Sequence, residues 1–411
     1  MAPCACPGAL AAKADGRQTN KPAEVEAIEA FLFSQAEFRH NVITHHCEIR
    51  WTEEAGFLPL TDRDVNTLWG RMNKTVGRVY LTDIYNVIHS EFVPLFNPFQ
   101  SYFDHLPSWD GVSDPIGDLA DTVHVKSDQA EFRDYFRKWF VGILPALLDD
   151  TVVNHEILVL IGEQGLYKTT WFNFLLPPEL RCYFYTKTNS DRLNKDDLFS
   201  LTEFALICFE ELDGMRPAEL NQLKAMVTMP YVNERAAYGR NKERHPHIAS
   251  FCGTGNNVQF LTDPTGNRRW LPFEVSQIRD PHLHAIPYEL VYSQAYALWK
   301  SGFCHWFSQE EIRKLNMHNS RFEVPNLEED LIRTHFRKPF EGEAGIFVTA
   351  ADILEQISSC LRYPLSPNKI GRIMAGLEFE SIRYKGKRGY IAVKKTGEDI
   401  DRERRSGALG L

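Results

Sequence analysis

Apolar residues recur along the chain with two spacings, and each spacing predicts a different kind of element. Between residues 129 and 148 they recur every three or four positions, which is typical of one face of a long helix. Short apolar runs at 157–161, 204–209 and 248–252, the last interrupted by Ser250, have the length and composition of buried strands. Helix and strand patterns alternate in this middle part, which predicts an α/β fold built on a parallel sheet.

The first apolar run leads into a glycine-containing loop, Gly162–Thr170, and then into a helical pattern. This order suits a phosphate-binding loop (P-loop), because backbone N–H groups of the loop and of the helix start surround the phosphates. Lys168 would reach the β- and γ-phosphates, and the Thr169 hydroxyl would hold Mg²⁺. The other candidate nucleotide-binding residues are Gly162, Gln164, Gly165, Tyr167 and Thr170.

Tyr167 departs from the G-x-x-x-x-G-K pattern, because it stands where the second glycine belongs. That glycine normally supplies unusual backbone dihedrals close to the phosphate, and Gly165 is the alternative source of flexibility. A buried strand with a glycine turn before a core helix is the purely structural interpretation of the same stretch.

The second apolar run ends in Glu210-Glu211-Leu212-Asp213, so it is expected to deliver carboxylates to the carboxyl edge of the sheet. Glu210 would hold Mg²⁺ and Glu211 would polarise the attacking water. Asp213 is an alternative metal ligand, or the N-cap of a helix expected over residues 217–229. The third run ends near Asn256, whose side chain would order water beside the γ-phosphate, unless this is only an Asn-rich turn.

Arg268 and Arg269 stand between a glycine turn and an apolar strand. In a P-loop ATPase such arginines reach the γ-phosphate of a neighbouring subunit and stabilise transition-state charge. The structural alternative is a surface pair with carboxylate partners.

Two basic segments are candidate DNA contacts. One is a predicted hairpin, and the other lies in a helix–turn–helix–hairpin pattern near the end of the chain, the layout of a winged helix. Their candidate residues are Arg235, Tyr238, Arg240, Lys242 and Arg244 in the first, and Lys385, Lys387 and Arg388 in the second. Solvated hairpins, or a winged helix that docks protein, remain open alternatives.

Composition restricts the kinds of partner and the cellular location that we expect. The net charge of −9 excludes a globally basic nucleic-acid coat, so DNA contacts must come from local patches. No apolar run reaches the length of a membrane span, and the first 20 residues lack the apolar core of a signal peptide. The eight cysteines show no paired spacing. We therefore expect a cytoplasmic protein without membrane contact.

These patterns predict a division into six segments. They are a disordered tail (1–22), a mostly helical N-terminal domain (23–125), the P-loop ATPase or helicase core (126–310), a helical connector and linker (311–344), a winged-helix-like domain (345–396) and a second disordered tail (397–411).

Taken together, Gly162–Thr170, Glu210–Asp213 and Thr265–Phe273 resemble the motifs of the virulence-associated protein E family. These proteins are P-loop ATPases of phage, plasmids and genomic islands, similar to superfamily 3 helicases and to the poxvirus primase-helicase. The resemblance covers roughly residues 35–300. It implies an AAA+-like P-loop core, use of ATP and Mg²⁺, and self-association, expected as a hexameric ring. Two departures, Tyr167 for glycine and Glu210 for aspartate, bear on the hydrolysis rate.

The function implied is that of a DNA replication helicase of a mobile genetic element, which hydrolyses ATP to translocate on or unwind single-stranded or forked DNA. A primase-like acidic motif does not precede the core, so a separate primase or replication initiator is an expected partner. One alternative is a nucleotide-gated loader, regulatory or defence protein that binds ATP and DNA or a partner without unwinding. Another is a winged-helix DNA binder with a degenerate ATPase.

Overall fold

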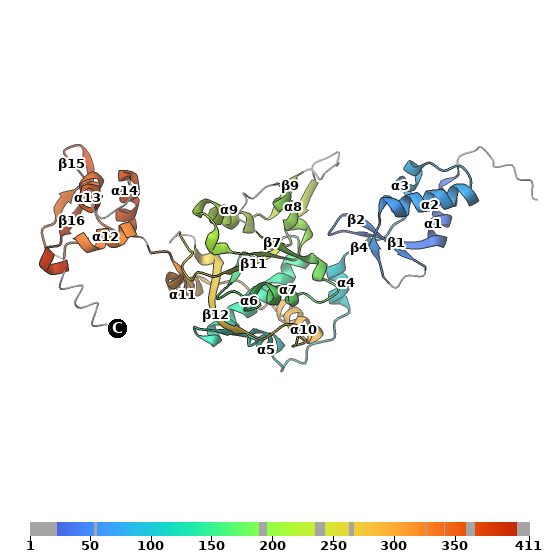
Figure 1. Cartoon of the computed structure of the whole chain (residues 1–411), viewed down its shortest axis with the longest axis horizontal. Coiled ribbons are helices and arrows are strands. Elements are labelled where there is room, and N and C mark those ends of the chain that lie inside the picture. The colour runs from blue at the N-terminus through green and yellow to red at the C-terminus, as the bar shows by residue number, and fades with distance from the viewer. Residues whose placement is uncertain are drawn as a thin grey trace, which may run out of the picture. The chain divides into compact units, whose positions relative to one another are not determined.

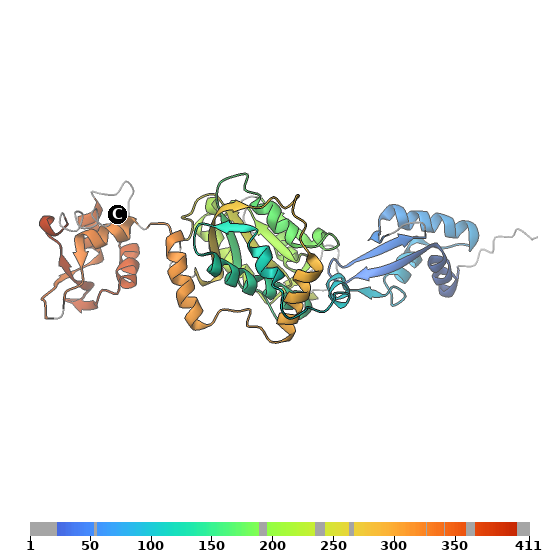
Figure 2. The same cartoon turned by 90° about the horizontal axis from the view of Figure 1, so that it is seen from below.

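The computed structural model describes residues 23–52, 56–188, 195–234, 243–262, 267–325, 327–340, 342–358 and 366–400. The chain divides into two compact units, residues 1–322 and 323–411. Figures 1 and 2 show the elements of both units from two directions.

A six-stranded sheet, with strand order β5-β12-β6-β11-β8-β7, organises the first unit. Its strands are β5 (Val123–Val125), β6 (Ile157–Ile161), β7 (Phe184–Lys187), β8 (Leu206–Phe209), β11 (Ser250–Gly255) and β12 (Trp270–Ile278). β5 pairs antiparallel with β12, and all other neighbours are parallel. The mixed α/β fold with a parallel sheet, expected from the alternating patterns, is therefore confirmed.

Helices cover both faces of this sheet (Figures 1 and 2). They are α4 (Pro98–Asp104), α5 (Pro115–Ala120), α6 (Gln129–Leu148), α7 (Lys168–Leu175), α8 (Lys195–Glu203), α9 (Pro217–Val227), α10 (Tyr288–Lys300) and α11 (Gln309–Asn319). Along β6, Leu158 and Leu160 face the cluster that contains α6 and α7, whereas Ile157, Val159 and Ile161 face the cluster that contains α9. Both faces are buried, which explains why the strand is an unbroken apolar run in the sequence.

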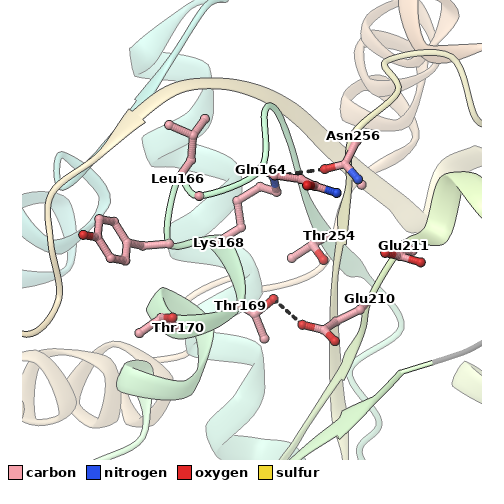
Figure 3. A pocket seen from close by; sticks show the side chains of 12 residues that line it. Gln164, Leu166, Lys168, Thr169, Thr170, Glu210, Glu211, Thr254 and Asn256 are labelled. Carbon is pink, nitrogen blue, oxygen red and sulfur yellow. Dashed lines mark hydrogen bonds between the residues drawn. The ribbon is translucent and has the colours of Figure 1, made fainter.

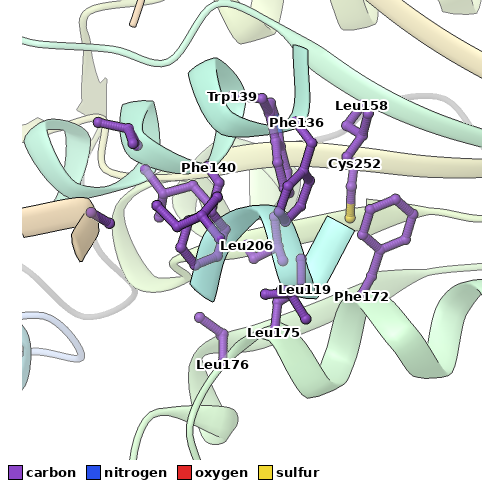
Figure 4. Packing of buried hydrophobic residues seen from close by; sticks show 14 of the residues in the cluster. Leu119, Phe136, Trp139, Phe140, Leu158, Phe172, Leu175, Leu176, Leu206 and Cys252 are labelled. Atoms are coloured by element: carbon purple, nitrogen blue, oxygen red, sulfur yellow. The ribbon is translucent and has the colours of Figure 1, made fainter. Parts of the chain in front are cut away.

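The long helix α6 anchors one face of the sheet through aromatic side chains. Phe136, Trp139 and Phe140 pack beside Leu158 and Cys252 from the strands, as Figure 4 shows. The Trp139 indole donates a hydrogen bond to the carbonyl of Phe251 (2.9 Å), so its one polar group is satisfied within the core. The helix spans residues 129–148, the range that the sequence pattern predicts.

The N-terminal part of the first unit is less helical than expected, because its strands form a four-stranded sheet of order β3-β2-β1-β4. Its elements are α1 (Val25–Gln35), β1 (Ala36–Asn41), β2 (His46–Trp51), β3 (Leu58–Pro59), α2 (Asp62–Thr75), α3 (Leu81–Ile88) and β4 (Leu95–Phe96). Between β1 and β2 the chain turns at residues 42–45. The side chain of Asn41 accepts hydrogen bonds from the N–H groups of Ile43 (3.0 Å) and Thr44 (3.2 Å), which stabilises the turn.

Short elements complete the first unit. They are the 3-10 turns η1 (Arg181–Tyr183), η2 (Leu212–Gly214), η3 (Asn267–Arg269) and η4 (Ser320–Phe322), and the antiparallel strands β9 (Tyr231–Glu234) and β10 (Glu243–Pro246). Strand β7 begins at Phe184, directly after η1.

The second unit has its own small core and sheet. Its elements are α12 (Leu327–His335), β13 (Phe336–Arg337), β14 (Ile346–Val348), α13 (Ala350–Ser358), α14 (Pro367–Gly376), β15 (Ser381–Tyr384) and β16 (Lys387–Lys394). Strand β16 pairs antiparallel with β13, β14 and β15. Because β13 pairs with β16 and Ile332 of α12 lies in this core, the unit begins at residue 323. The expected division instead began this domain at residue 345.

Candidate functional site

The glycine-containing loop connects β6 with α7 and is fixed at its base by Gly162. The N–H of Gly162 donates to the carbonyl of Gly255 (3.1 Å) on the neighbouring strand β11. A Cβ atom at Gly162 would lie 2.9 Å from the carbonyl oxygen of Val275. Only glycine fits this close approach of backbone to backbone, so Gly162 is required by the packing of the loop against β12.

Tyr167 has the backbone conformation that a glycine would normally supply. Its φ of 61° and ψ of 18° are left-handed, and it is the N-cap of α7. The Tyr167 carbonyl accepts a hydrogen bond from the N–H of Trp171 (2.7 Å), which closes the first turn of the helix. For a non-glycine residue this conformation costs on the order of 1 kcal/mol. The tyrosine therefore preserves the loop geometry at a cost in strain.

Lys168 lies at the centre of the loop. Its Nζ donates to the carbonyls of Gly162 (2.6 Å) and Glu163 (2.7 Å), and it lies 3.5 Å from Oδ1 of Asn256. Burial lowers the pKa of the Lys168 ammonium from its ordinary value, and the negative charge of Asp213 acts in the opposite direction. Among the described residues, the hydrogen-bond acceptors of this buried cation are neutral oxygens, which it can exchange for an anion.

Two oxygen-bearing side chains meet beside this lysine. Oγ1 of Thr169, in the first turn of α7, donates a hydrogen bond to Oε1 of Glu210 (2.7 Å), as Figure 3 shows. Glu210 follows β8, and its N–H is held by the carbonyl of Lys187 (3.1 Å). The next residue, Glu211, is exposed and has a left-handed φ of 54°. A hydroxyl and a carboxylate are hard oxygen donors of the kind that Mg²⁺ prefers, so this pair fits that ion.

A pocket of about 350 Å³ lies among these groups. Its lining combines loop residues, both acidic residues and the end of β11: Gln164, Gly165, Leu166, Tyr167, Lys168, Thr169, Thr170, Glu210, Glu211, Thr254, Gly255 and Asn256. Sequence reasoning missed Leu166, Thr254 and Gly255. Thr254 carried a signal, because it is a polar residue at the end of an otherwise apolar strand, directly before the Gly-Asn turn.

The sheet explains why three distant segments converge. Strand β11 lies between β6 and β8 and pairs in parallel with both, with Gly255 opposite Ile161 and Gly253 opposite Phe209. The carboxyl ends of the three strands therefore meet at one edge. The residues that follow each strand, Lys168, Glu210 and Asn256 among them, are brought to one place although they are far apart in sequence.

Arg268 and Arg269 lie away from this pocket. They form η3 directly before β12, and Trp270 pairs with Ile157 at the amino end of β6. Five strand residues separate that end from the loop, a distance of roughly 16 Å at about 3.3 Å per residue. Neighbouring Glu156 interacts electrostatically with Arg269, and burial raises the pKa of its carboxyl to about 7. The two arginines thus mark the opposite edge of the sheet.

The candidate DNA-binding residues are described only in part. Arg235, Tyr238, Arg240 and Lys242 lie outside the described residues, between the paired strands β9 and β10. Arg244 lies on β10, exposed, with its guanidinium 3.5 Å from the centroid of the Tyr231 ring. In the second unit, Lys385, Lys387 and Arg388 are exposed on the hairpin of β15 and β16.

The class of protein defined by this geometry is a mixed α/β protein with a polar pocket at the carboxyl edge of a parallel sheet. A family model for the virulence-associated protein E-like domain matches residues 104–324, more than half of the chain. The chain belongs to the virulence-associated protein E-like family. The resemblance of its motifs to that family is thereby confirmed.

Solved structures offer weaker similarities. The NrS-1 C-terminal region (residues 305–718, apo) is 11% identical, with 90% of this chain and 99% of that chain covered and a TM-score of 0.47. The S. cerevisiae Hsp104–ADP complex is 13% identical, covering 70% of this chain and 44% of that one, with a TM-score of 0.26. No curated protein matches the chain. At these values neither structure adds to what the chain's own geometry indicates.

Every helix in the described parts of the chain is too short or too polar to cross a membrane.

The conformation of Tyr167 generates a prediction. Tyr167→Gly should relieve the left-handed strain and keep the affinity for a fluorescent ATP analogue within about threefold of the unmodified chain. Tyr167→Val places a β-branched residue at the same φ and should lower the free energy of unfolding by about 1–2 kcal/mol. Analogue titration and thermal unfolding of both variants test this. Loss of analogue binding in the glycine variant would instead show that the tyrosine ring is a structural part of the loop.

Proposed function

We propose that this protein is an ATP-dependent DNA replication ATPase of a mobile genetic element, which hydrolyses ATP to translocate on or unwind DNA. The observation that carries the proposal is the pocket, where a buried lysine, a Thr–Glu pair, a second glutamate and an asparagine converge. These are the groups that phosphoryl transfer to water requires: a cation for the phosphates, oxygens for a metal, a base and a polar group for the water.

The loop Gly162–Thr170 is proposed as a P-loop. Lys168 would leave the carbonyls of Gly162 and Glu163 to bind the β- and γ-phosphates, and the N–H groups at the start of α7 would face the same anion. Thr169 and Glu210 would hold Mg²⁺, which when bound neutralises charge on the phosphate oxygens.

The attacking water is proposed to bind on the side of the pocket formed by Glu211 and Asn256. Glu211 would orient and polarise the water, and Asn256 would fix its position relative to the γ-phosphate. The exposure of Glu211 is compatible with access of water to this side. The left-handed backbone of Glu211 is a conformation that tends to persist at functional sites.

Arg268 and Arg269 are proposed to act on a neighbouring subunit. Their place at the amino edge, roughly 16 Å along β6 from the loop, argues against action in their own pocket. In a ring whose subunits contact amino edge to carboxyl edge, they would approach the neighbour's γ-phosphate and stabilise developing charge. A hexamer is implied by the family resemblance.

The basic hairpin of the second unit is proposed to contact DNA. Arg383 stands directly opposite Arg388 in the β15–β16 register, and both are exposed. Like charges facing each other across two strands are destabilising unless an anion lies between them. Phosphates of a DNA backbone are the anions that such a hairpin fits. The helices α13 and α14 followed by this hairpin support a winged-helix interpretation.

The segment between β9 and β10 is the second proposed DNA contact, by way of Arg235, Tyr238, Arg240, Lys242 and Arg244. Basic and aromatic side chains together suit a single strand, which offers both phosphates and base faces. A separate primase or replication initiator is a proposed partner. The alternative function, a nucleotide-gated loader or regulatory protein, is favoured by one observation, the strained tyrosine in the loop.

Subunit mixing tests hydrolysis and its dependence on a neighbour. We expect Lys168→Ala and the double variant Arg268→Ala/Arg269→Ala each to lower ATP turnover by about 100-fold or more. Mixed in equal amounts, they should recover about a quarter of the unmodified rate, because random assembly pairs an intact loop with intact arginines at about one interface in four.

Arg313→Ala, an exposed arginine on α11, is the matched control and should leave turnover unchanged. Absence of recovery on mixing, with both variants folded and assembled, would contradict action on a neighbour.

A second prediction concerns the basic hairpin. Lys385→Ala/Lys387→Ala should weaken DNA binding about tenfold at low salt and reduce the slope of log affinity against log salt by about 1–2. Arg333→Ala/Lys338→Ala removes the same charge from the same unit, at positions already paired with Glu329 and Glu378, and is the control. Fluorescence anisotropy with labelled DNA measures both. If the control variant loses as much DNA affinity, the effect comes from net charge alone, which would contradict a specific DNA contact at the hairpin.

A further inference from the structure

Asp213 holds the turn that follows β11. Its carboxylate accepts hydrogen bonds from the N–H of Asn256 (3.1 Å, to Oδ1), the N–H of Asn257 (3.2 Å, to Oδ2) and Nδ2 of Asn257 (2.7 Å, to Oδ2). Both carboxylate oxygens therefore point at N–H donors of one short turn. Bonds of this charge-assisted kind are stronger than those between neutral groups.

Strand β11 is shaped to receive the segment that carries Asp213. A Cβ atom at Gly253 would lie 2.3 Å from Cδ1 of Leu212, and a Cβ atom at Gly255 would lie 3.0 Å from Oδ1 of Asp213. Two glycines, spaced by two residues on one face of the strand, thus leave room for two consecutive residues of η2. Leu212 is buried in the core, so the contact is fixed by packing as well as by hydrogen bonds.

The sequence suggested two roles for Asp213 that this geometry does not favour. The N-cap of α9 is Arg216 rather than Asp213. The carboxylate already accepts three N–H groups of the turn, so at most one of its roughly four lone-pair positions is left for a metal. The Thr169–Glu210 pair, in contrast, involves oxygens already directed into the pocket (Figure 3).

We propose that Asp213 is a positioning residue that fixes Asn256 relative to Glu210 and Glu211, an inference that rests on the proposed ATPase function. Asp213 follows Glu211 by two residues, and it accepts hydrogen bonds from the backbone N–H groups of both Asn256 and Asn257. Asp213 thereby links Glu211, the proposed water-polarising residue, to Asn256 at the end of β11. Asn256 in turn lies 3.5 Å from Lys168, so the connection extends to the loop.

Hydrolysis should depend on this connection more than nucleotide binding does. Asp213→Asn keeps the shape but places an amide NH₂ against at least one N–H donor, so the turn loses part of its support. We expect kcat for ATP to fall about 10- to 100-fold while KM stays within about threefold, because Lys168 and the loop N–H groups remain in place to bind the phosphates. The Mg²⁺ concentration required for half-maximal binding of an ATP analogue should not change.

A second variant reaches the same contact from the opposite side. Gly255→Ala adds a methyl group 3.0 Å from Oδ1 of Asp213 and should displace the carboxylate. Its effect on kcat should resemble that of Asp213→Asn, and the double variant should be little worse than either single variant. Additive losses would mean that the two residues act independently, which would overturn the proposal.

Hydrogen exchange gives a readout that does not need turnover. Amides of Asn256 and Asn257 should exchange about tenfold faster or more in Asp213→Asn than in the unmodified full chain without nucleotide. Asp149→Asn is the matched control, because Asp149 accepts from the N–H and hydroxyl of Thr151 in a turn leading towards β6, and it should leave exchange at 256–257 unchanged.

The outcomes separate this inference from the proposed function. Faster exchange in a chain that never hydrolyses ATP would support the positioning role and overturn the ATPase. Unchanged exchange at 256–257 would overturn the positioning role, whatever the rate of hydrolysis. Unchanged exchange together with a raised Mg²⁺ requirement would assign Asp213 to the metal instead.

Discussion

The pairing of β11 with both β6 and β8 is the constraint on which the candidate site depends. Strand β11 bonds to its two neighbours in parallel register, so all three strands end at one edge. The register has little freedom, because alternate residues of β6 are buried in two different cores and a slip of one residue would exchange them. Lys168, Glu210 and Asn256 meet because of this pairing, not because of any contact encoded near them in sequence.

Close contacts at three glycines restrict how the parts of the site can move. Gly162 lies against β12, and Gly253 and Gly255 admit the turn η2 against β11. These contacts leave the loop, the acidic segment and the asparagine turn little room to move independently. The backbone is strained at two positions of the site, because Tyr167 and Glu211 both have left-handed conformations. Strain of this kind persists where the surrounding packing holds it, as the glycine contacts do here.

Much of the fold followed from the sequence, because buried parallel strands and the long helix α6 have strong apolar patterns. The polar residues at the strand ends followed from the same patterns. The contacts of Asp213 with Asn256 and Asn257 did not, because they depend on packing between segments far apart in sequence. The N-terminal sheet was underestimated, because β3 and β4 have only two residues each. The unit boundary was misplaced, since β13 is defined only by its pairing with β16. In the sequence, only the place of Tyr167 at the second glycine of the motif indicated its left-handed conformation.

We propose that the pocket turns over ATP rather than only binding it. The most direct measurement is the ATP hydrolysis rate of the full chain with Mg²⁺, with and without single-stranded DNA, together with its mass in solution with ATP. We expect Mg²⁺-dependent hydrolysis that single-stranded DNA accelerates, by an assembly larger than a monomer. Stable ATP binding without turnover, with or without DNA, would contradict it and favour a nucleotide-gated binding protein.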